Sequence, residues 1–527
     1  MWFLLERSWS ERRRSLLTGV GTVALGMLIG AMVAFLPLQL AFIPISLLAC
    51  LLVVLLWALP ELPAVPIRFL RPTLHVFIVV LLCLPPYMAI ALPGMPWVSV
   101  RRLVLFSMLL MALLSLAGSL AVRRQVKGVV AGNGALVGVG FAFFLSLVLS
   151  VPFSQNIALS FKGIVDVLLS WYGPFLCVLL AIRTHGHVIQ VFRTLVVCLI
   201  VVVLFGVAEF ILERNIFISL VPTNMLAENP ILDGVVFLYR MRNMMYRATS
   251  TFLVPLTFGE FIAMVFPVAL YFIFYGRGPR DIGLGILGLL MSVAGLVTSG
   301  ARGGFVSALV AAAVFSGLYC IRLVRWRQDS LFGPFLLSIY PLGMATMLGA
   351  VFLWRRLYNM VLGGGDTAAS TSARFIQWEM GWPHILHNPL FGHGLHMGAV
   401  VVGYRGSEED ILTIDSYVLK LLVECGVPGL LSFFSFVMIA IILGTHQYLG
   451  NRDARAAAAL PFVAGLTAFL VYRLALAQNE NHIFLFILLG LWGALYTLLV
   501  QDPEKEIRST GTTALRAEGG SHARPLS

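Results

Sequence analysis

Long runs of apolar residues, separated by short polar segments, dominate this sequence. A helix needs about 20 consecutive apolar residues to cross the hydrocarbon core of a membrane, because each residue adds about 1.5 Å. Runs of this length predict about fourteen spans, at 16–36, 39–59, 73–92, 103–122, 133–152, 163–182, 189–212, 251–275, 281–299, 303–323, 331–353, 417–445, 457–477 and 482–500. Some neighbouring runs are separated by only two or three residues, so twelve spans are the alternative.

The same pattern predicts the organisation of the chain. Residues 1–500 are expected to form a single all-α, polytopic membrane domain, and 501–527 a disordered cytoplasmic tail, since the tail has no apolar period. Two long polar segments lie on one side of the predicted spans, at about 213–250 and 354–416. The second precedes the third-last span and contains several Trp and Tyr residues, so we expect short amphipathic helices on the membrane face there.

Composition and charge agree with a membrane protein. Hydrophobic residues make up 59% of the chain and charged residues 11%, with a mean hydropathy of +0.94. A water-exposed surface could not be covered with so few polar groups, so a soluble multidomain protein is excluded. The net charge is +12. Most Lys and Arg residues fall in alternate loops, which predicts cytoplasmic termini and assigns the basic excess to topology rather than to nucleic acid.

Several arginines fall on the side where positive charge is disfavoured. They are Arg240, Arg242, Arg247, Arg302, Arg374 and Arg473. The guanidinium group grips phosphate with two parallel hydrogen bonds, so an outward cluster at membrane depth indicates a phosphate-bearing lipid ligand. Snorkelling or pairing with local carboxylates is the alternative for any one of them. The phosphate interpretation is favoured for Arg302, because flanking glycines permit close backbone approach. Arg101 and Arg102 are interpreted as interfacial anchors.

Other polar groups lie in or near the spans. Lys420 and Glu424 are one helical turn apart and are expected to neutralise each other. The acidic residues Asp166, Glu209 and Glu260 could instead form an ion relay, as in a transporter. The second long loop also holds four histidines, at positions 384, 387, 393 and 396. Interfacial hydrogen bonding, or contact with a sugar or phosphate, is favoured there over metal binding, and no cofactor is expected.

Four motifs, in order along the chain, resemble the O-antigen ligase and polymerase superfamily. They are Arg247–Phe252, Ser299–Gly304, His387–Leu395 and Asp415–Gly429, and the resembling region covers about 240–445. The resemblance implies a GT-C-like membrane glycosyltransferase. It implies that the donor is a glycan linked to undecaprenyl diphosphate and that the enzyme acts at the periplasmic face of the bacterial inner membrane. Residues 354–416 would then be the large periplasmic loop. Membrane lipid, a flippase and a chain-length regulator are the implied partners, and nucleic acid is not among them.

The resemblance also implies roles for individual residues. The phosphate-gripping arginines correspond to Arg247 and Arg302, with Arg374 and Arg473 as further diphosphate-binding candidates. Asp415 and Arg302 are the candidate catalytic residues, and no metal is needed for this chemistry. Asp415 would accept the proton of the acceptor hydroxyl, although it could also cap the helix that begins after it.

At one position the chain departs from the family pattern, and this departure bears on whether it is a ligase or a polymerase. Where the ligase branch has His-Asn, nine residues and Gly-x-x-Gly, this chain has Asp415-Ser416, nine residues and Gly426-x-x-Gly429. The histidine implied as the ligase base is absent, which favours a polymerase that joins repeat units over a ligase that moves finished glycan to an acceptor. A transporter or flippase and an inert scaffold subunit are the alternatives from other classes.

Overall fold

The structure is a computed structural model and describes residues 65–90, 98–217, 241–242, 245–328, 331–353, 368–406, 412–474 and 476–500. The chain divides into two compact units. The first comprises Met1–Ala64 and Leu116–Leu120, of which the structure describes only the last five residues. The second comprises Val65–Ser115 and Ala121–Ser527 and contains every contact discussed below.

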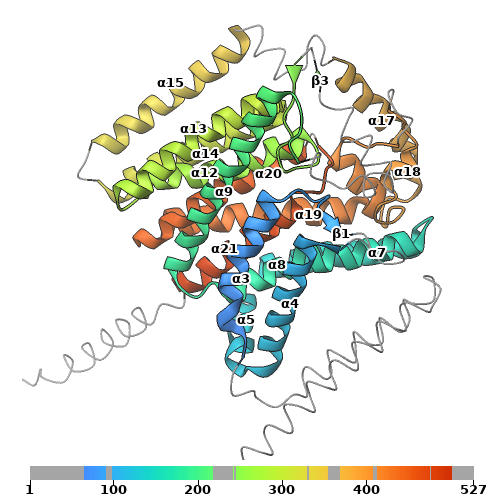
Figure 1. Ribbon diagram of the computed structural model, residues 1–527, viewed down its shortest axis with the longest axis horizontal. Helices are drawn as coiled ribbons and strands as arrows, with labels where there is room; N and C mark the ends of the chain where they lie inside the picture. Colours follow the sequence, from blue (N-terminus) through green and yellow to red (C-terminus); the bar gives the residue numbers. More distant parts are fainter. Residues whose placement is uncertain are drawn as a thin grey trace, which may run out of the picture. The chain divides into compact units, whose positions relative to one another are not determined.

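Helices account for almost all of the described residues (Figure 1). They are α3 (Ile67–Cys83), α4 (Val100–Gly118), α5 (Leu120–Gly132), α6 (Gly134–Ser150), α7 (Ile157–Val167), α8 (Gly173–Ala181), α9 (His185–Leu212), α12 (Pro255–Tyr275), α13 (Pro279–Ser299), α14 (Arg302–Trp326), α15 (Phe332–Leu353), α17 (Ala368–His387), α18 (Gly398–Val402), α19 (Tyr417–Gly450), α20 (Ala459–Arg473) and α21 (His482–Val500). Two antiparallel pairs of two-residue strands, β1 (Ala89–Ile90) with β2 (Val98–Ser99) and β3 (Met241–Arg242) with β4 (Met245–Tyr246), are the strands of the described segments. The predicted all-α polytopic class is confirmed.

Ten described helices are long and apolar enough to cross a membrane. They correspond to the predicted spans from 103–122 to 303–323 and from 417–445 to 482–500. The predicted span 331–353 forms α15, a helix of 22 residues. The prediction for 73–92 was wrong in its bounds, because α3 begins at Ile67 and the Pro85–Pro86 pair follows its end at Cys83. Spans 16–36 and 39–59 and the tail lie outside the described residues.

Three helices form the buried centre of the larger unit. About three quarters of the apolar windows of α12, α20 and α21 are buried inside the protein, against about a third for α4, α6 and α19. Helix α12 packs against α9, α13, α14 and α20. The outer helices instead expose large apolar side chains, which a membrane would cover.

The two ends of this bundle differ in chemistry. At one end Arg71 contacts His187, Arg193 pairs with Asp281, and Arg322 donates to the carbonyl of Asp453. These contacts bring together loops that the sequence predicted to share the basic side. The opposite end, termed the site end, holds the C-termini of α3, α9, α13 and α20 and the N-termini of α4, α12, α14, α19 and α21. Its loops are tied together by contacts such as those of Thr251 with the Leu82 carbonyl and of Asn481 with the Thr257 carbonyl.

The second long loop is more helical than its sequence predicted. We expected short amphipathic helices over 354–416, but α17 runs for 20 residues before ending at His387, shortly before Pro389. One face of α17 buries Gln377 and Ile385, and the other leaves Phe375 and Trp382 exposed. An exposed apolar row on a helix at the site end is consistent with a position in the membrane interface. Residues 354–367 and 407–411 lie outside the described segments.

Helix α19 is broken near its start, and the preceding loop fills the break. Gly426 has non-helical angles (φ 68°, ψ −173°), which split α19 into a short outer segment before it and a long segment after it. The backbone groups released by the break are satisfied by the loop. Val427 N donates to Pro389 O (2.8 Å), and His393 N and Gly394 N donate to Val423 O (2.8 Å) and Glu424 O (3.0 Å).

This interlock requires glycine on both sides. A Cβ at Gly426 would lie 2.5 Å from Pro389 O, and a Cβ at Gly392 would lie 2.5 Å from the Glu424 carbonyl. Both glycines have a φ between 67° and 68°, which disfavours any other residue. The motifs His387–Leu395 and Asp415–Gly429 are therefore joined in space, and their glycines and Pro389 serve to hold the loop in the helix break.

We expect Gly426→Ala to destabilise the folded protein by about 2–5 kcal/mol, because its backbone angles are essentially restricted to glycine and a Cβ would overpack against backbone. Gly403→Ala is the matched control, because Gly403 also has a positive φ (70°) but no atom lies within 4 Å of the position that a Cβ would take there. That variant should lose only about 1–2 kcal/mol. Thermal unfolding of the purified proteins measures both, and equal losses would contradict the interlock.

Candidate functional site

The turn between α13 and α14 positions two of the predicted arginines. Gly300 ends α13 with left-handed angles (φ 56°), Ala301 follows as the N-cap, and Arg302 is the first residue of α14. Arg247 crosses this turn, with its Nε donating to the Ser299 carbonyl at 3.1 Å. A Cβ at Gly300 would lie 3.3 Å from that Nε. Glycine is thus required here for the backbone angle and for the approach of Arg247.

Close helix packing sets this turn against the core. A Cβ at Gly259 of α12 would lie 2.7 Å from the Ala301 Cβ, and one at Gly304 would lie 3.1 Å from the Gly259 backbone. Small residues at a crossing let helix backbones approach closely in a membrane. The N-terminus of α14 carries a partial positive charge from its unpaired amides, so Arg247 and Arg302 stand where an anion is already favoured.

Tyr472 links the arginine turn to α17. Its ring packs on Gly303, where a Cβ would lie 3.0 Å from a ring carbon, and its hydroxyl donates to the Leu256 carbonyl. The hydroxyl lies within electrostatic reach of Arg247, Arg374 and Arg473. Arg374, which comes from α17, therefore acts electrostatically on the same group as Arg247. Glu260 also acts on this tyrosine, so positive and negative charges surround it.

Asp415 contacts α17, the helix that carries Arg374. Its backbone amide donates to Gln377 Oε1 at 2.9 Å, one turn along α17 from Arg374. Burial raises the pKa of the Asp415 carboxyl, and the Arg374 charge and the Gln377 amide lower it in part. The helix-capping alternative for Asp415 was wrong. Ser416 is the N-cap of α19, and its Oγ accepts from Leu419 N at 3.3 Å.

Arg473 is held in the protein interior. Its side chain is fully buried and forms an ion pair with Glu260, which is buried as well. Arg473 also donates to the carbonyls of Leu476 and Gln478, while Glu260 accepts from Asn481 Nδ2 at 2.8 Å. A diphosphate could reach Arg473 only by displacing these partners. The pair is better described as an anchor that fixes residues 476–481 against α12.

The acidic residues proposed as an ion relay have separate partners. Glu209 accepts from the Tyr246 hydroxyl (2.8 Å) and from the backbone amides of Thr249 (3.2 Å) and Ser250 (2.6 Å). It therefore fixes the segment that carries Arg247. Asp166 accepts from the Ser170 hydroxyl at 3.2 Å. Glu209, Asp166 and the Glu260–Arg473 pair are thus each engaged in a different local contact.

The predicted pairing of Lys420 with Glu424 was wrong. Within the described chain, Glu424 accepts from Gly398 N at 3.2 Å and no ion pair joins it to Lys420. The Asn479 side-chain amide, oriented to satisfy both of its groups, accepts from Lys420 Nζ at 2.9 Å. The one-turn spacing favoured a local pair, but the loop docked in the break of α19 draws Glu424 toward its own backbone.

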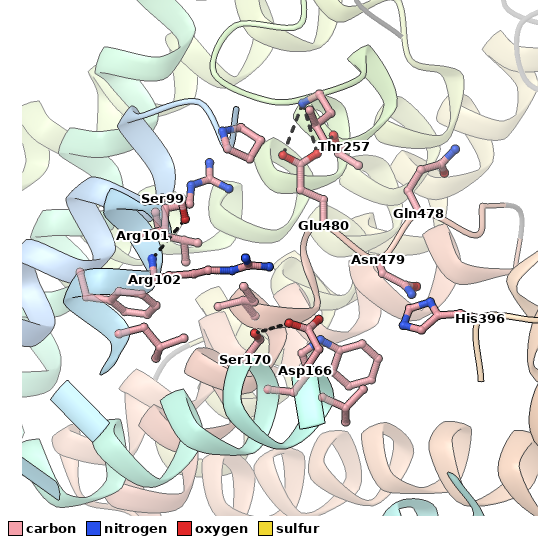
Figure 2. Close-up of a pocket in the computed structure, with 18 of the residues that line it drawn as sticks. Ser99, Arg101, Arg102, Asp166, Ser170, Thr257, His396, Gln478, Asn479 and Glu480 are labelled. Atoms are coloured by element: carbon pink, nitrogen blue, oxygen red, sulfur yellow. Dashed lines mark hydrogen bonds between the residues drawn. The ribbon is translucent and has the colours of Figure 1, made fainter. Parts of the chain in front are cut away.

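A cavity of about 530 Å³ opens beside these groups at the site end. Figure 2 shows Arg101 and Arg102 on one side of it and Glu480 with Asn479 facing them. Further lining residues are Ser99, Asp166, Ser170, Thr257, His396 and Gln478. Arg101 donates to the Leu84 carbonyl at 2.7 Å. The charge of Arg101 also acts on Glu480, whose pKa is raised mainly by burial and lowered in part by Arg101.

Sequence reasoning missed this cavity. Arg101 and Arg102 were interpreted as interfacial anchors, and Glu480 was not singled out at all. The available signal was that all three are charged residues on the predicted outer side, close to span ends. The cavity is formed from segments near positions 100, 166, 255, 396 and 480, and pairing such distant segments requires the tertiary structure.

The four loop histidines separate into two groups. The rings of His384 and His387 lie 5.9 and 6.4 Å from that of His393, whereas His396 lines the cavity. Across the described residues, no three His, Cys, Asp or Glu side chains are grouped so as to hold a metal ion.

Together these features define a multi-pass helical membrane protein with several arginines, and a cavity lined by apolar, polar and charged side chains, at one end of its bundle. A protein-family model described as O-Antigen ligase matches residues 287–434. This segment, under a third of the chain, contains Arg302, Arg374, Asp415 and the interlock. The resemblance is confirmed there, and it supports a membrane enzyme that processes glycans. The comparison with curated proteins found no match.

Proposed function

We propose that the chain is a membrane glycosyltransferase that polymerises glycan repeat units carried on undecaprenyl diphosphate. The observation that carries the proposal is the arginine cluster beside Asp415. Arg247 and Arg302 flank the N-terminus of α14, and the charge of Arg374 acts on both Tyr472 and Asp415. Cations around a helix N-terminus suit a diphosphate, and an adjacent carboxylate suits proton removal from a hydroxyl. The family match supports the broader class of glycan-processing enzyme.

The proposed reaction is a displacement at C1 of the donor sugar. Arg247 and Arg302 hold the diphosphate and stabilise the negative charge that develops as the C1–O bond breaks. An acceptor hydroxyl oxygen forms the new bond to C1, with inversion if the displacement is single. Its proton passes to the Asp415 carboxylate, and undecaprenyl diphosphate leaves. Arg374 keeps Asp415 ionised, because its positive charge opposes the effect of burial on the Asp415 pKa.

The proposal places this chemistry at the periplasmic face of the bacterial inner membrane, with both termini in the cytoplasm. The concentration of arginines at the end opposite the site supports that orientation. The donor oligosaccharide on its lipid carrier and the surrounding membrane lipid are the direct partners. A flippase that supplies the donor and a chain-length regulator are the proposed protein partners.

Replacing Asp415 tests its role as the base. Asp415→Asn keeps the size of the side chain but cannot accept the proton, so we expect about a 10²–10⁴-fold loss of polymer formation. Ser416→Ala is the matched control. It removes the cap of α19, which costs about 1 kcal/mol of stability, but it should leave the chemistry intact. The length and amount of polymer on gels measure the activity of both variants. Full activity of Asp415→Asn would show that Asp415 is not the base.

The pH dependence gives the same test a second readout. The base must be ionised, so activity should rise with pH as Asp415 loses its proton, with a midpoint above that of an ordinary aspartate. Arg374→Gln removes a charge that lowers this pKa, so the rise should move to higher pH. Initial rates of the purified protein across the acidic to neutral pH range would reveal the shift. If the pH profile of Arg374→Gln matched that of the wild type, Arg374 would not influence the ionisation of Asp415.

A ligase is the second candidate, favoured by the description of the matching family. The two functions leave different products in a strain lacking the gene. Loss of a polymerase leaves single repeat units attached to the acceptor. Loss of a ligase leaves complete chains on the carrier lipid. Asp415 in the place of the histidine implied for ligases favours the polymerase.

A further inference from the structure

The cavity at the site end is lined by charged groups of both signs. Arg101 and Arg102 face Asp166 and Glu480 across it (Figure 2), so two positive groups are matched by two carboxylates. A phosphate entering this space would meet both carboxylates, which repel it. At the Gly300 turn, by contrast, Arg247 and Arg302 flank the N-terminus of α14, where the helix amides also favour an anion. The two places therefore favour different parts of a ligand.

The rest of the lining offers both hydrogen-bond donors and acceptors. Hydroxyls come from Ser99, Ser170 and Thr257, and amides from Gln478 and Asn479. Apolar side chains such as Phe77, Leu105 and Ile483 complete it. Hydroxyl groups donate and accept at once, so a hydroxyl-rich ligand can satisfy such a mixed lining where an anion cannot. The cavity volume of about 530 Å³ falls in the range of small-molecule sites, roughly 300–1,000 Å³.

His396 is held in a strained conformation at this cavity. Its φ of 66° lies in the left-handed region. Its ring packs over Gly163, where a Cβ would lie 2.4 Å from the ring. Burial lowers the pKa of the imidazole, which is then neutral near pH 7 and offers one donor and one acceptor. Strain at a non-glycine residue that lines a cavity is a feature of functional sites.

One wall of the cavity is fixed by the buried anchor. Arg473 binds the Gln478 carbonyl and Glu260 binds Asn481, and these contacts bracket Asn479 and Glu480. Glu480 is itself held by the Thr257 hydroxyl at 2.7 Å. Asn479 contacts Lys420, which lies in the first turns of the helix that follows Asp415. The wall is thus preorganised, and Lys420 connects it to the first turns of α19.

We propose that this cavity is a carbohydrate subsite that holds an uncharged, hydroxyl-bearing sugar of the glycan, separate from the place where the diphosphate binds. Asp166, Glu480 and His396 accept hydrogen bonds from its hydroxyls, and Arg101 and Arg102 donate to its oxygens. This inference rests on the proposed function, and it assigns specificity for the sugar to residues outside the arginine cluster.

Direct binding to the purified full-length protein in nanodiscs tests the subsite. One probe is a set of two- to four-sugar fragments, prepared by partial hydrolysis of the polysaccharide that the host cell makes. The other probe is inorganic pyrophosphate. His396→Gly removes the imidazole and its packing on Gly163, but it relieves the backbone strain, because glycine adopts this angle freely. Asp166→Asn removes one carboxylate. His387→Ala is the matched control, because it is an exposed histidine of the same loop outside the cavity.

We expect His396→Gly and Asp166→Asn each to weaken fragment binding at least tenfold while leaving pyrophosphate binding within twofold. Arg302→Ala should do the reverse, and His387→Ala should change neither. Unchanged fragment binding in both cavity variants, or no fragment binding by the wild type, would overturn the subsite. If the cavity variants lost pyrophosphate binding instead, the cavity would be an anion site, and the carbohydrate subsite would again be overturned. Failure of the proposed function appears separately, as normal polymer in cells carrying Arg302→Ala.

Discussion

Arg302→Ala is expected to abolish polymer formation without lowering the amount of protein in the membrane. Arg302 begins α14, beside Arg247 and the Gly300 turn, where the proposed diphosphate leaves. Removing one group that stabilises charge in a transition state typically costs 10²–10³-fold in rate, or about 2.7–4 kcal/mol. The side chain is at a helix terminus and only half-buried, so the fold should tolerate its loss. Polymer length on gels and immunoblots of the membrane fraction measure the two quantities.

The same helix supplies the control. Arg325 lies at the opposite end of α14, over the ring of Trp326, and Arg325→Ala should leave polymer formation unchanged. Arg302→Lys keeps the charge but loses the planar fork, so an intermediate activity is expected. Normal polymer in Arg302→Ala would refute the diphosphate clamp.

Breaking the buried ion pair should give the largest loss of stability. Glu260→Gln leaves the Arg473 guanidinium without its counter-charge in a fully buried position. Removing one partner of such a pair costs about 3–5 kcal/mol. The structural consequence extends to residues 476–481, which the pair holds against α12. We therefore expect a strongly lowered unfolding temperature and a reduced protein level.

Two further variants make this prediction specific. The double variant Glu260→Gln with Arg473→Met removes both charges, so it should be less destabilised than the sum of the single variants. Asp281→Asn breaks the pair with Arg193, whose side chain is 48% exposed, and should cost about 1 kcal/mol or less. Equal losses in Glu260→Gln and Asp281→Asn would show that Arg473 does not depend on Glu260.

The spans could be predicted from the sequence because the physical requirement is local. A run of apolar residues long enough to cross a membrane is visible without knowledge of its neighbours, and α9, α12 and α21 lie close to their predicted bounds. Arg247 and Arg302 could be singled out for a similar reason, since the side of the membrane follows from counting spans. Their proximity at the Gly300 turn could not be derived from that count.

The remaining features depend on contacts between distant segments. Arg473 had the same sequence signal as Arg302, but the structure buries it against Glu260, 213 positions away. Glu424 had a partner one turn away and instead accepts from Gly398 in the docked loop. The cavity required Arg102, Asp166, His396 and Glu480 to meet. In each case tertiary packing chose among pairings that the sequence left open.

The break in α19 separates its first two and a half turns from the rest of the helix, and Asp415 lies at the far end of this short segment from the break. Residues 417–425 precede the pivot at Gly426, and nine residues of helix extend about 13 Å. A tilt of about 10° at the pivot would therefore carry Asp415 through about 2 Å, comparable to the difference between a hydrogen bond and no contact. The loop wedged into the break sets the angle of this short segment. A substitution at Pro389 or Gly392 that changed this angle would therefore displace Asp415 more than the residues next to Gly426.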